Sequence, residues 1–354
     1  MDVLVLTPDL DIVGVLDTFE SLIWVDRYND SGDFEIYSKV SMEILSLLQK
    51  DYYLWRRSSE RLMIIEDITI KFDVNDGNTV IFAGRSIESI LNRRIIWSQT
   101  TIKGSLQLGI KTLLDENAIA PILPERTIPK LIFETSTDPA ITSLELEAQF
   151  IRTNLFESVR DICQAFDIGF KIVLSDDLST LVFKLYAGEN RSYAQFLNPY
   201  IIFSPKFDNL ISSTYKESQS SVKNVNVVAG EGDEETRKMV TVGEASGLDR
   251  REMATDAGDI SQTVDGVLIT DAEYLAQLEQ RGVEELLEYW EQPVFEGEID
   301  PNVNPKYGED FFLGDIVQLA NEIGLSSTAR ISEFTYSQSP TDINAYPTFV
   351  IIEE

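Results

Sequence analysis

The chain has 354 residues, of which 43% are hydrophobic, and a formal net charge of −31 at pH 7. This length predicts two or three domains, and so acidic a surface repels nucleic-acid phosphates and anionic lipid head groups. Histidine is absent and Cys163 is the single cysteine, which excludes Ser-His-Asp and Cys-His catalysis, intramolecular disulfides and multi-cysteine zinc sites.

The N-terminal stretch "MDVLVLTPDLDIVG" has neither the basic region nor the long apolar segment of a secretory signal. No apolar run in the chain approaches the roughly 20 residues that span a bilayer. We therefore expect a soluble protein without membrane anchoring, and the single cysteine fits a reducing compartment.

Residues 1–103 are expected to form a domain made mostly of strands. The segment 33–40 alternates apolar and polar residues and leads into a short helix, for which Ser41 is the N-terminal cap. Two β-rich runs then flank "NDGN" (75–78), a sequence typical of a tight hairpin turn. A short helix in "RSIESILNRR" (85–94) follows them.

Residues 104–198 are expected to form an α+β domain. Its clearest helix is "NLFESVRDICQAFD", where Asn154 and Glu157 predict an N-terminal capping pair. Cys163 falls on the apolar face of this helix, so we interpret it as a buried structural thiol. The proline-rich segment 121–130 reads as an extended connector, and two strands are predicted around the turn at 175–179.

The next part of the chain is predicted to start a second β unit and then to leave it. Strand patterns in 199–230 belong to that unit, whereas 231–304 is interpreted as an insertion. The insertion holds an acidic loop, a polar irregular segment and an amphipathic helix that Thr270 and Glu273 open as a capping box. The segment "EQPVFEGEIDPNVNPKYGED" is expected to be a long linker.

Residues 305–354 carry three strand-like runs, which would complete the split second unit. One of them, "TARISEFTY" (328–336), resembles "RLMIIEDITI" (61–70), which favours two related β-barrels, one from each end of the chain. Gly314 permits a backbone bend before the first run, and Asp315 can accept bonds from nearby amides. We therefore interpret Asp315 as architectural.

Without histidine, acid–base chemistry would fall to carboxylates, lysine or tyrosine. The adjacent pairs Glu66–Asp67 and Asp176–Asp177 are candidates, but strand neighbours point to opposite faces and acids are common in turns. "DVNDG" (73–77) begins like a calcium loop but lacks the glycine and glutamate required at the sixth and twelfth positions. We expect no catalytic, cofactor-binding or metal site, and a carboxylate-based glycoside hydrolase is the less favoured alternative.

Four stretches, in order, resemble the tail-hub family of long-tailed phages, which is structurally akin to the central baseplate hub of contractile phages. They are "GVLDTFESLIWVDRYNDSGDFEIY", "MIIEDITI … VIFAGRSIESILNRRII", "GLDRREMATDAGDI" and "FFLGDIVQL … TARISEF". The positions that carry the family-like turns and strand openers are Gly32, Gly84, Arg94, Gly314 and Asp315. Residues 105–198 contribute little to the resemblance.

The resemblance implies a mainly β protein with α+β parts. Its architecture would combine two tube-like β-barrels with an inserted α+β domain and a helix-containing insertion. It further implies a homotrimer that joins the hexameric tail tube and the distal tail ring to a threefold tip. Its partners would be the tail tube protein, the distal tail protein, a tip, fibre or receptor-binding protein and the tape-measure protein. Such a hub belongs to the virion, is assembled in the host cytoplasm, and needs no cofactor or enzymatic activity.

The charge suggests that DNA passes through the hub without being bound, because an acidic channel wall repels it. Two other functions remain open. A carbohydrate-binding or receptor-binding tail module could stack sugars on Trp55, Trp97 or Trp290, although these residues lie among apolar neighbours. A hub with cell-wall hydrolase activity is the other, and a cellular acidic enzyme is the remaining alternative outside the tail.

Overall fold

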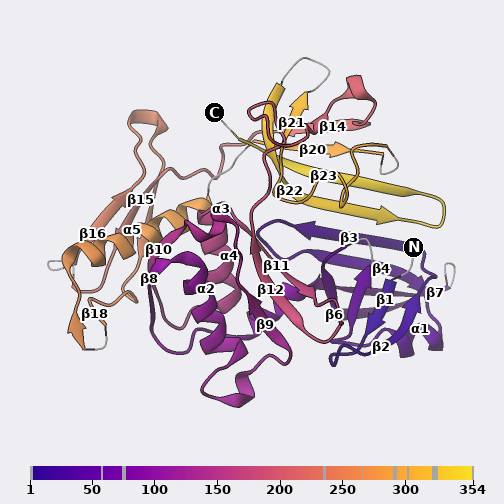
Figure 1. Cartoon of the computed structure of the whole chain (residues 1–354), viewed down its shortest axis with the longest axis horizontal. Coiled ribbons are helices and arrows are strands. Elements are labelled where there is room, and N and C mark those ends of the chain that lie inside the picture. Colours follow the sequence, from indigo (N-terminus) through magenta and orange to yellow (C-terminus); the bar gives the residue numbers. More distant parts are fainter. Residues whose placement is uncertain are drawn as a thin grey trace.

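The computed structural model describes residues 3–56, 59–73, 77–233, 237–264, 266–289, 293–300, 303–320 and 326–352. The fold is mainly β, as expected, with helices concentrated in the middle of the sequence (Figure 1). No described helix combines the length and the apolar character needed to cross a bilayer. Asn75 and Asp76 of the expected turn, and Trp290, lie outside the described residues.

The largest element is a 13-stranded sheet to which both ends of the chain contribute. Its N-terminal strands are β1 (Val3–Leu6), β2 (Ile12–Leu16), β3 (Ser21–Arg27), β4 (Asp33–Lys39), β5 (Tyr53–Arg56), β6 (Leu62–Asp73) and β7 (Gly77–Ser86). The others are β13 (Ile202–Phe203), β14 (Ser212–Lys216), β20 (Val294–Glu298), β21 (Ile316–Ala320), β22 (Ser326–Gln338) and β23 (Ile343–Ile351). Figure 1 shows the indigo strands of the first group beside the yellow strands of the second.

Two four-strand units within this sheet have the same topology. The first unit runs β3-β4-β7-β6 across the sheet, and the second runs β14-β20-β23-β22, antiparallel throughout. β6 shifts register between Ile65 and Asp67, and β22 does so between Ile331 and Glu333. The two stretches that resemble each other in sequence therefore occupy equivalent bulged strands.

The two units are joined edge to edge where β22 pairs with β3. Along the described strands the main path of pairing runs from β14 to β2, and β21 with β13 branches from β22. Neither unit closes into one of the two separate β-barrels that the sequence analysis expected. Alternation places Leu22 and Trp24 of β3 and Phe334 of β22 on the same face, in one shared hydrophobic core. The units are thus parts of one folded body, because removing either would expose the core of the other.

The inserted α+β unit covers the other face of β1, β5 and the first half of β6. It comprises η1 (Ile87–Arg93), β8 (Thr100–Ser105), α2 (Leu106–Leu114), β9 (Leu131–Glu134), α3 (Pro139–Thr142), β10 (Glu145–Phe150), α4 (Leu155–Ala165), β11 (Gly169–Leu174) and β12 (Leu181–Tyr186). Leu4 and Ile64 of the large sheet pack into its core. As expected, Asn154 caps α4 and Cys163 is a buried free thiol.

A smaller side unit packs on the inserted unit. It contains β15 (Val225–Ala229), β16 (Met239–Val242), β17 (Glu252–Asp256), the short hairpin β18 (Thr263–Val264) and β19 (Val267–Leu268), and helix α5 (Asp271–Leu287). The expected capping box of Thr270 and Glu273 is present. Gln149 of β10 donates a hydrogen bond to Gln277 of α5, with a nitrogen–oxygen distance of 3.5 Å.

Two expectations about this region are wrong. The segment expected to be irregular contains β17, which pairs parallel with β15, whereas the expected linker contains β20, which pairs with both β14 and β23. Both strands are five residues long and rich in polar or acidic side chains, so their local pattern is weak. Their partners, which are distant in sequence, make them strands.

We predict that Gly84→Ala destabilises the fold. A Cβ atom at this position would lie 1.9 Å from the carbonyl oxygen of Ile64, so the strands must separate. The expected loss in unfolding free energy is about 1–3 kcal/mol, measured by chemical denaturation. Ala83→Ser, on the opposite face of the same strand, is the control and should change little. Equal stability of the two variants would contradict this close approach.

We also predict a pH dependence from Glu284 of α5. This side chain is buried, accepts a hydrogen bond from Gln280, and faces Arg281, Asp161 and Glu285. Burial raises the pKa of Glu284 to about 7, so above pH 4.5 the unfolded chain ionises this group before the folded chain does.

Stability should therefore fall by no more than about 3 kcal/mol as the pH rises from 4.5 to about 7. Glu284→Gln should remove this part of the dependence in pH-resolved denaturation curves. An unchanged slope in that variant would rule out Glu284 as its source.

Candidate functional site

The inserted unit and the two sheet units meet around Tyr28, which follows β3. The Tyr28 hydroxyl donates to the Asp167 carbonyl oxygen at 3.2 Å, and its backbone nitrogen donates to the Ser332 carbonyl oxygen at 2.9 Å. The Arg330 guanidinium lies 5.4 Å from the ring centre and forms an ion pair with Asp167. Burial raises the pKa of Tyr28 to about 12, which keeps the phenol neutral. This three-way junction fixes how the inserted unit sits on the sheet.

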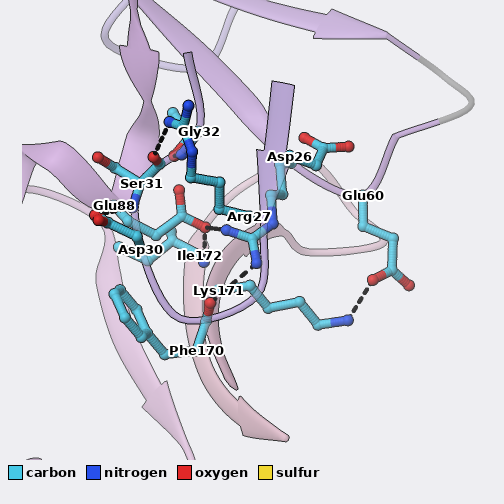
Figure 2. A network of polar contacts seen from close by, with 12 residues as sticks. Asp26, Arg27, Asp30, Ser31, Gly32, Glu60, Glu88, Phe170, Lys171 and Ile172 are labelled. Carbon is cyan, nitrogen blue, oxygen red and sulfur yellow. Dashed lines mark hydrogen bonds and ion pairs between the residues drawn. The ribbon is translucent and has the colours of Figure 1, made fainter. Parts of the chain in front are cut away.

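A buried ion pair strengthens the same junction. Arg61, at the start of β6, contacts Glu88 of η1 with a nitrogen–oxygen distance of 2.9 Å, and the side chains are 3% and 0% exposed. Arg61 also donates to the Phe170 carbonyl oxygen, whereas Glu88 accepts from the Ile172 amide. Figure 2 shows Glu88 beside Phe170 and Ile172. Burial opposes the charge on Arg61, but Glu88 together with Tyr186, Asp26 and Tyr307 outweighs burial, so the pKa of Arg61 rises.

The Asp315 carboxylate, which the sequence analysis interprets as architectural, is buried and accepts three hydrogen bonds. They come from the Glu189 amide at 2.7 Å, from the Arg191 side chain at 2.8 Å and from the Phe312 amide at 3.0 Å. These bonds tie the segment that leaves the inserted unit to the start of β21. Burial raises the pKa of Asp315, although the three donors oppose that rise.

The glycines of the family-like positions allow close backbone approaches. Gly314 has φ of +88°, and a Cβ atom there would lie 2.2 Å from the Tyr28 ring. The Gly32 amide donates to the Ser86 hydroxyl at 2.8 Å, at the end of β7 that also holds Gly84. The structure therefore brings Gly32 near Gly84, and Gly314–Asp315 near the junction.

Arg94 lies apart from these positions, inside the inserted unit. It donates to the carbonyl oxygen of Arg126 at 2.6 Å and holds the loop after η3 (Pro124–Arg126). Nearby, Trp97 is 58% exposed, but the Arg126 guanidinium lies 5.0 Å from its ring centre. One face of this indole is therefore already covered by a cation.

A cleft of about 900 Å³ opens beside the junction, between β11 and the 307–315 segment. Four of its lining residues are cations, and each lies in an ion pair: Arg61 with Glu88, Lys171 with Glu60, Lys184 with Glu134, and Arg191 with Asp315. Figure 2 shows the Lys171–Glu60 pair. A cleft whose cations are already paired offers little attraction to a phosphate or carboxylate ligand.

The carboxylate pairs singled out in the sequence have structural contacts. Glu66 accepts two hydrogen bonds from Arg85, at 2.8 and 2.7 Å. Asp177 accepts bonds from Ser175 and Ser179, which lower its pKa, whereas a general acid needs a raised one. Among the described residues, no group of three or more carboxylate or thiol side chains could hold a metal ion.

The face of the two units that points away from the shared core carries alternating polar side chains. Arg27 lies there between Glu333 at 2.6 Å and Asp33 at 2.7 Å, and links β3 to β22. Register places these carboxylates on this open face: Asp33, Glu35, Asp67, Asp73, Glu296, Glu298 and Glu333. Its cations are Arg27, Lys39, Lys71, Arg85 and Lys216. The open face is thus mixed in charge with a small excess of acid.

Sequence reasoning missed the Arg61–Glu88 pair. Each residue stands alone in an apolar setting, Arg61 before "LMII" and Glu88 within "SIESIL". A lone charge among apolar residues signals a buried partner, but the sequence does not reveal which partner it is.

The comparisons with known proteins agree with this architecture. A family profile described as "Siphovirus ReqiPepy6 Gp37-like protein" matches residues 2–349. No curated protein is similar enough to be matched to the chain.

Three crystal structures of tail proteins share the fold over 99% of this chain. The prophage tail protein gp18 of Listeria monocytogenes has a TM-score of 0.53, 14% identity and 94% of its own length covered. The 43 kDa tail protein of prophage MuSo2 from Shewanella oneidensis has a TM-score of 0.58, 11% identity and 98% of its own length covered. The tail protein from Neisseria meningitidis MC58 has a TM-score of 0.58, 10% identity and 96% of its own length covered.

We predict that Glu88→Gln lowers the unfolding free energy by about 3–5 kcal/mol, because it leaves the Arg61 charge buried without its partner. Chemical denaturation measures the loss. The matched control is Asp51→Asn, which breaks the exposed Arg93–Asp51 pair of similar length and should cost no more than about 1 kcal/mol.

The double variant Arg61→Met with Glu88→Leu should lose less unfolding free energy than the sum of the losses of its two single variants. Additive losses would show that the two charges do not interact.

Proposed function

Because the chain belongs to the Siphovirus ReqiPepy6 Gp37-like family of phage tail proteins, we propose that it is a structural hub of the tail tip. Three copies would surround the tail axis and join the hexameric tail tube and distal tail ring to a threefold tip. Its work is assembly and not catalysis. The acid-rich cleft beside the three-way junction, with its cations already paired, supports a scaffold role.

The duplicated unit is the observation that carries this proposal. Each chain holds two four-strand units of the same strand order, already joined edge to edge through β22 and β3. Three chains would supply six such units, which matches the sixfold symmetry of a tail tube while keeping threefold symmetry below it. A chain with one unit could not match both symmetries in this way.

The open face of the sheet would line the channel for the passing DNA. Its carboxylates outnumber its cations, and Arg27 and Arg85 are held in ion pairs with Glu333 and Glu66. Such a wall offers few free cations to phosphate groups, so DNA would slide past it without specific binding. Most of the chain's negative charge lies elsewhere, on surfaces that would face solvent or partners.

The remaining parts would serve as contact platforms. We propose four parts close to those expected from the sequence: a first hub domain, an inserted domain that starts at η1 and not at residue 104, an insertion that starts at β15 and not at residue 231, and a second hub domain to which β20 adds a strand. The tail tube, distal tail, tape-measure and tip or fibre proteins are the proposed partners. The exposed side chains of Phe196 and Leu197, 91% and 94% accessible, offer one contact surface.

We predict that cryo-electron microscopy of tails containing this chain shows three copies around the axis, with six related sheet units in one ring. A single copy, or copies placed away from the axis, would refute the proposal. Purified chain should give no clearing in a peptidoglycan zymogram and no hits on a glycan array. Activity in either assay would favour the hydrolase or the carbohydrate-binding alternative.

A further inference from the structure

Helix α5 of the side unit has one apolar face and one polar face, and each packs on a different unit. The helix lies between β15 and β16 of the side unit and β10 and α4 of the inserted unit (Figure 1). On the first side, Tyr274 and Leu278 are buried in a small core with Val228. Within the described parts of the chain, this core includes no residue of the inserted unit. The side unit is therefore held together by its own apolar contacts.

The other face of α5 meets the inserted unit through polar side chains. Gln277 accepts a hydrogen bond from Gln149 of β10, with a nitrogen–oxygen distance of 3.5 Å. Glu273 forms an ion pair with Lys103 of β8. Polar contacts of this kind can be exchanged for contacts with water at a small cost in free energy. The side unit can therefore separate from the inserted unit while each keeps its own core.

Carboxylates crowd the contact between α4 and α5. Glu284 is buried there, and the charged groups that face it are Asp161 of α4 and Arg281 and Glu285 of α5. The Arg281 guanidinium is held by Asp259, 3.2 Å away. Three carboxylates thus lie around one cation that is already paired, and ionisation of Glu284 brings a further negative charge against Asp161 across the contact.

The arginine of α4 does not offset this charge. The Arg160 guanidinium lies 2.8 Å from Asp161 and 3.6 Å from Glu288, so it is shared by two other carboxylates. Glu284 accepts a hydrogen bond from Gln280 at 3.0 Å, and among the described residues it forms no ion pair. The contact between the two helices is therefore strongest when Glu284 carries a proton.

We propose that the side unit undocks from the inserted unit as the pH rises, and that ionisation of Glu284 drives this separation. Undocking would uncover the polar faces of β10 and α4 while the large sheet stays intact. This inference goes beyond the proposed hub and does not depend on it.

The direction follows from proton linkage. In the docked state, burial raises the pKa of Glu284 to about 7, from an ordinary value of 4.5 that solvent restores on undocking. Docking is therefore strongest below pH 4.5 and weakens as the pH rises towards 7. The gap between these two values corresponds to a change of roughly 300-fold in the docking equilibrium constant.

Thiol labelling of the purified full-length chain tests the undocking. Gln277→Cys places a thiol in the contact, where the native side chain is 3% exposed. The protection ratio is the labelling rate of Leu248→Cys, at a fully exposed position of the side unit, divided by that of Gln277→Cys. This division cancels the effect of pH on the thiol itself. With dithiodipyridine as the reagent, the ratio should fall at least tenfold between about pH 5.5 and about pH 8.

Two buried thiols separate undocking from unfolding. Val228→Cys reports on the core of the side unit, and the native Cys163 reports on the core of the inserted unit. Both positions are fully buried, and peptide mass spectrometry distinguishes their labels. Neither should become more reactive over the same pH range. Loss of protection at Val228→Cys together with Gln277→Cys would show that the side unit unfolds, which would overturn the proposal.

A matched pair of variants of α5 tests the charge itself, in the Gln277→Cys background. Glu284→Gln should keep the protection ratio constant over the pH range. Glu279→Gln removes an exposed carboxylate of the same helix and should leave the fall unchanged. A ratio that does not depend on pH in the parent chain, or a fall that persists in Glu284→Gln, would overturn the proposal.

Small-angle X-ray scattering gives a second measurement on chains without added cysteines, at matched low concentration. The maximum dimension should be larger at about pH 8 than at about pH 5.5 for the parent chain and for Glu279→Gln. For Glu284→Gln it should be the same at both pH values. Equal dimensions for all three chains at both pH values would contradict undocking.

Discussion

The pairing of β22 with β3 holds the two halves of the large sheet together. It brings the last long strands of the chain against the first ones, and it makes a single core out of side chains from both ends, such as Trp24 and Phe349. Six residue pairs of backbone contact, supported by Arg27 and Glu333, hold two units that would otherwise each expose an apolar face. The duplicated units therefore act as one rigid segment of a larger sheet.

The inserted unit is fixed on this segment by polar contacts buried in an apolar setting. Arg61 and Glu88 join strands of the sheet to backbone groups of β11, and Tyr28 contacts all three parts. Apolar packing alone would tolerate small rotations between the units. A charged pair with fixed donors and acceptors tolerates them poorly, because each misplaced bond leaves a buried polar group unsatisfied.

The distribution of charge also follows from the fold. The chain carries −31 overall, yet the open face of the two units mixes acids with cations such as Lys39 and Lys71. An excess of acid over the whole surface repels the phosphates of nucleic acids. A mixed face on the sheet limits repulsion between strands that must lie side by side.

Features that depend on residues close together in the chain can be predicted from the sequence alone. The structure confirms four such predictions: the cap of α4 at Asn154, the capping box of α5, the β6–β7 hairpin and the burial of Cys163. The likeness between residues 61–70 and 328–336 also predicts that the chain contains two related β units.

Which strands lie together depends on how the whole chain packs. The sequence suggests a linker where β20 forms and an irregular segment where β17 forms. The partner of Arg61 lies 27 residues away, at Glu88. The physical reason is that a strand satisfies its hydrogen bonds through another segment. A short polar strand therefore carries little signal of its own, and its partner is set by the packing of the whole chain.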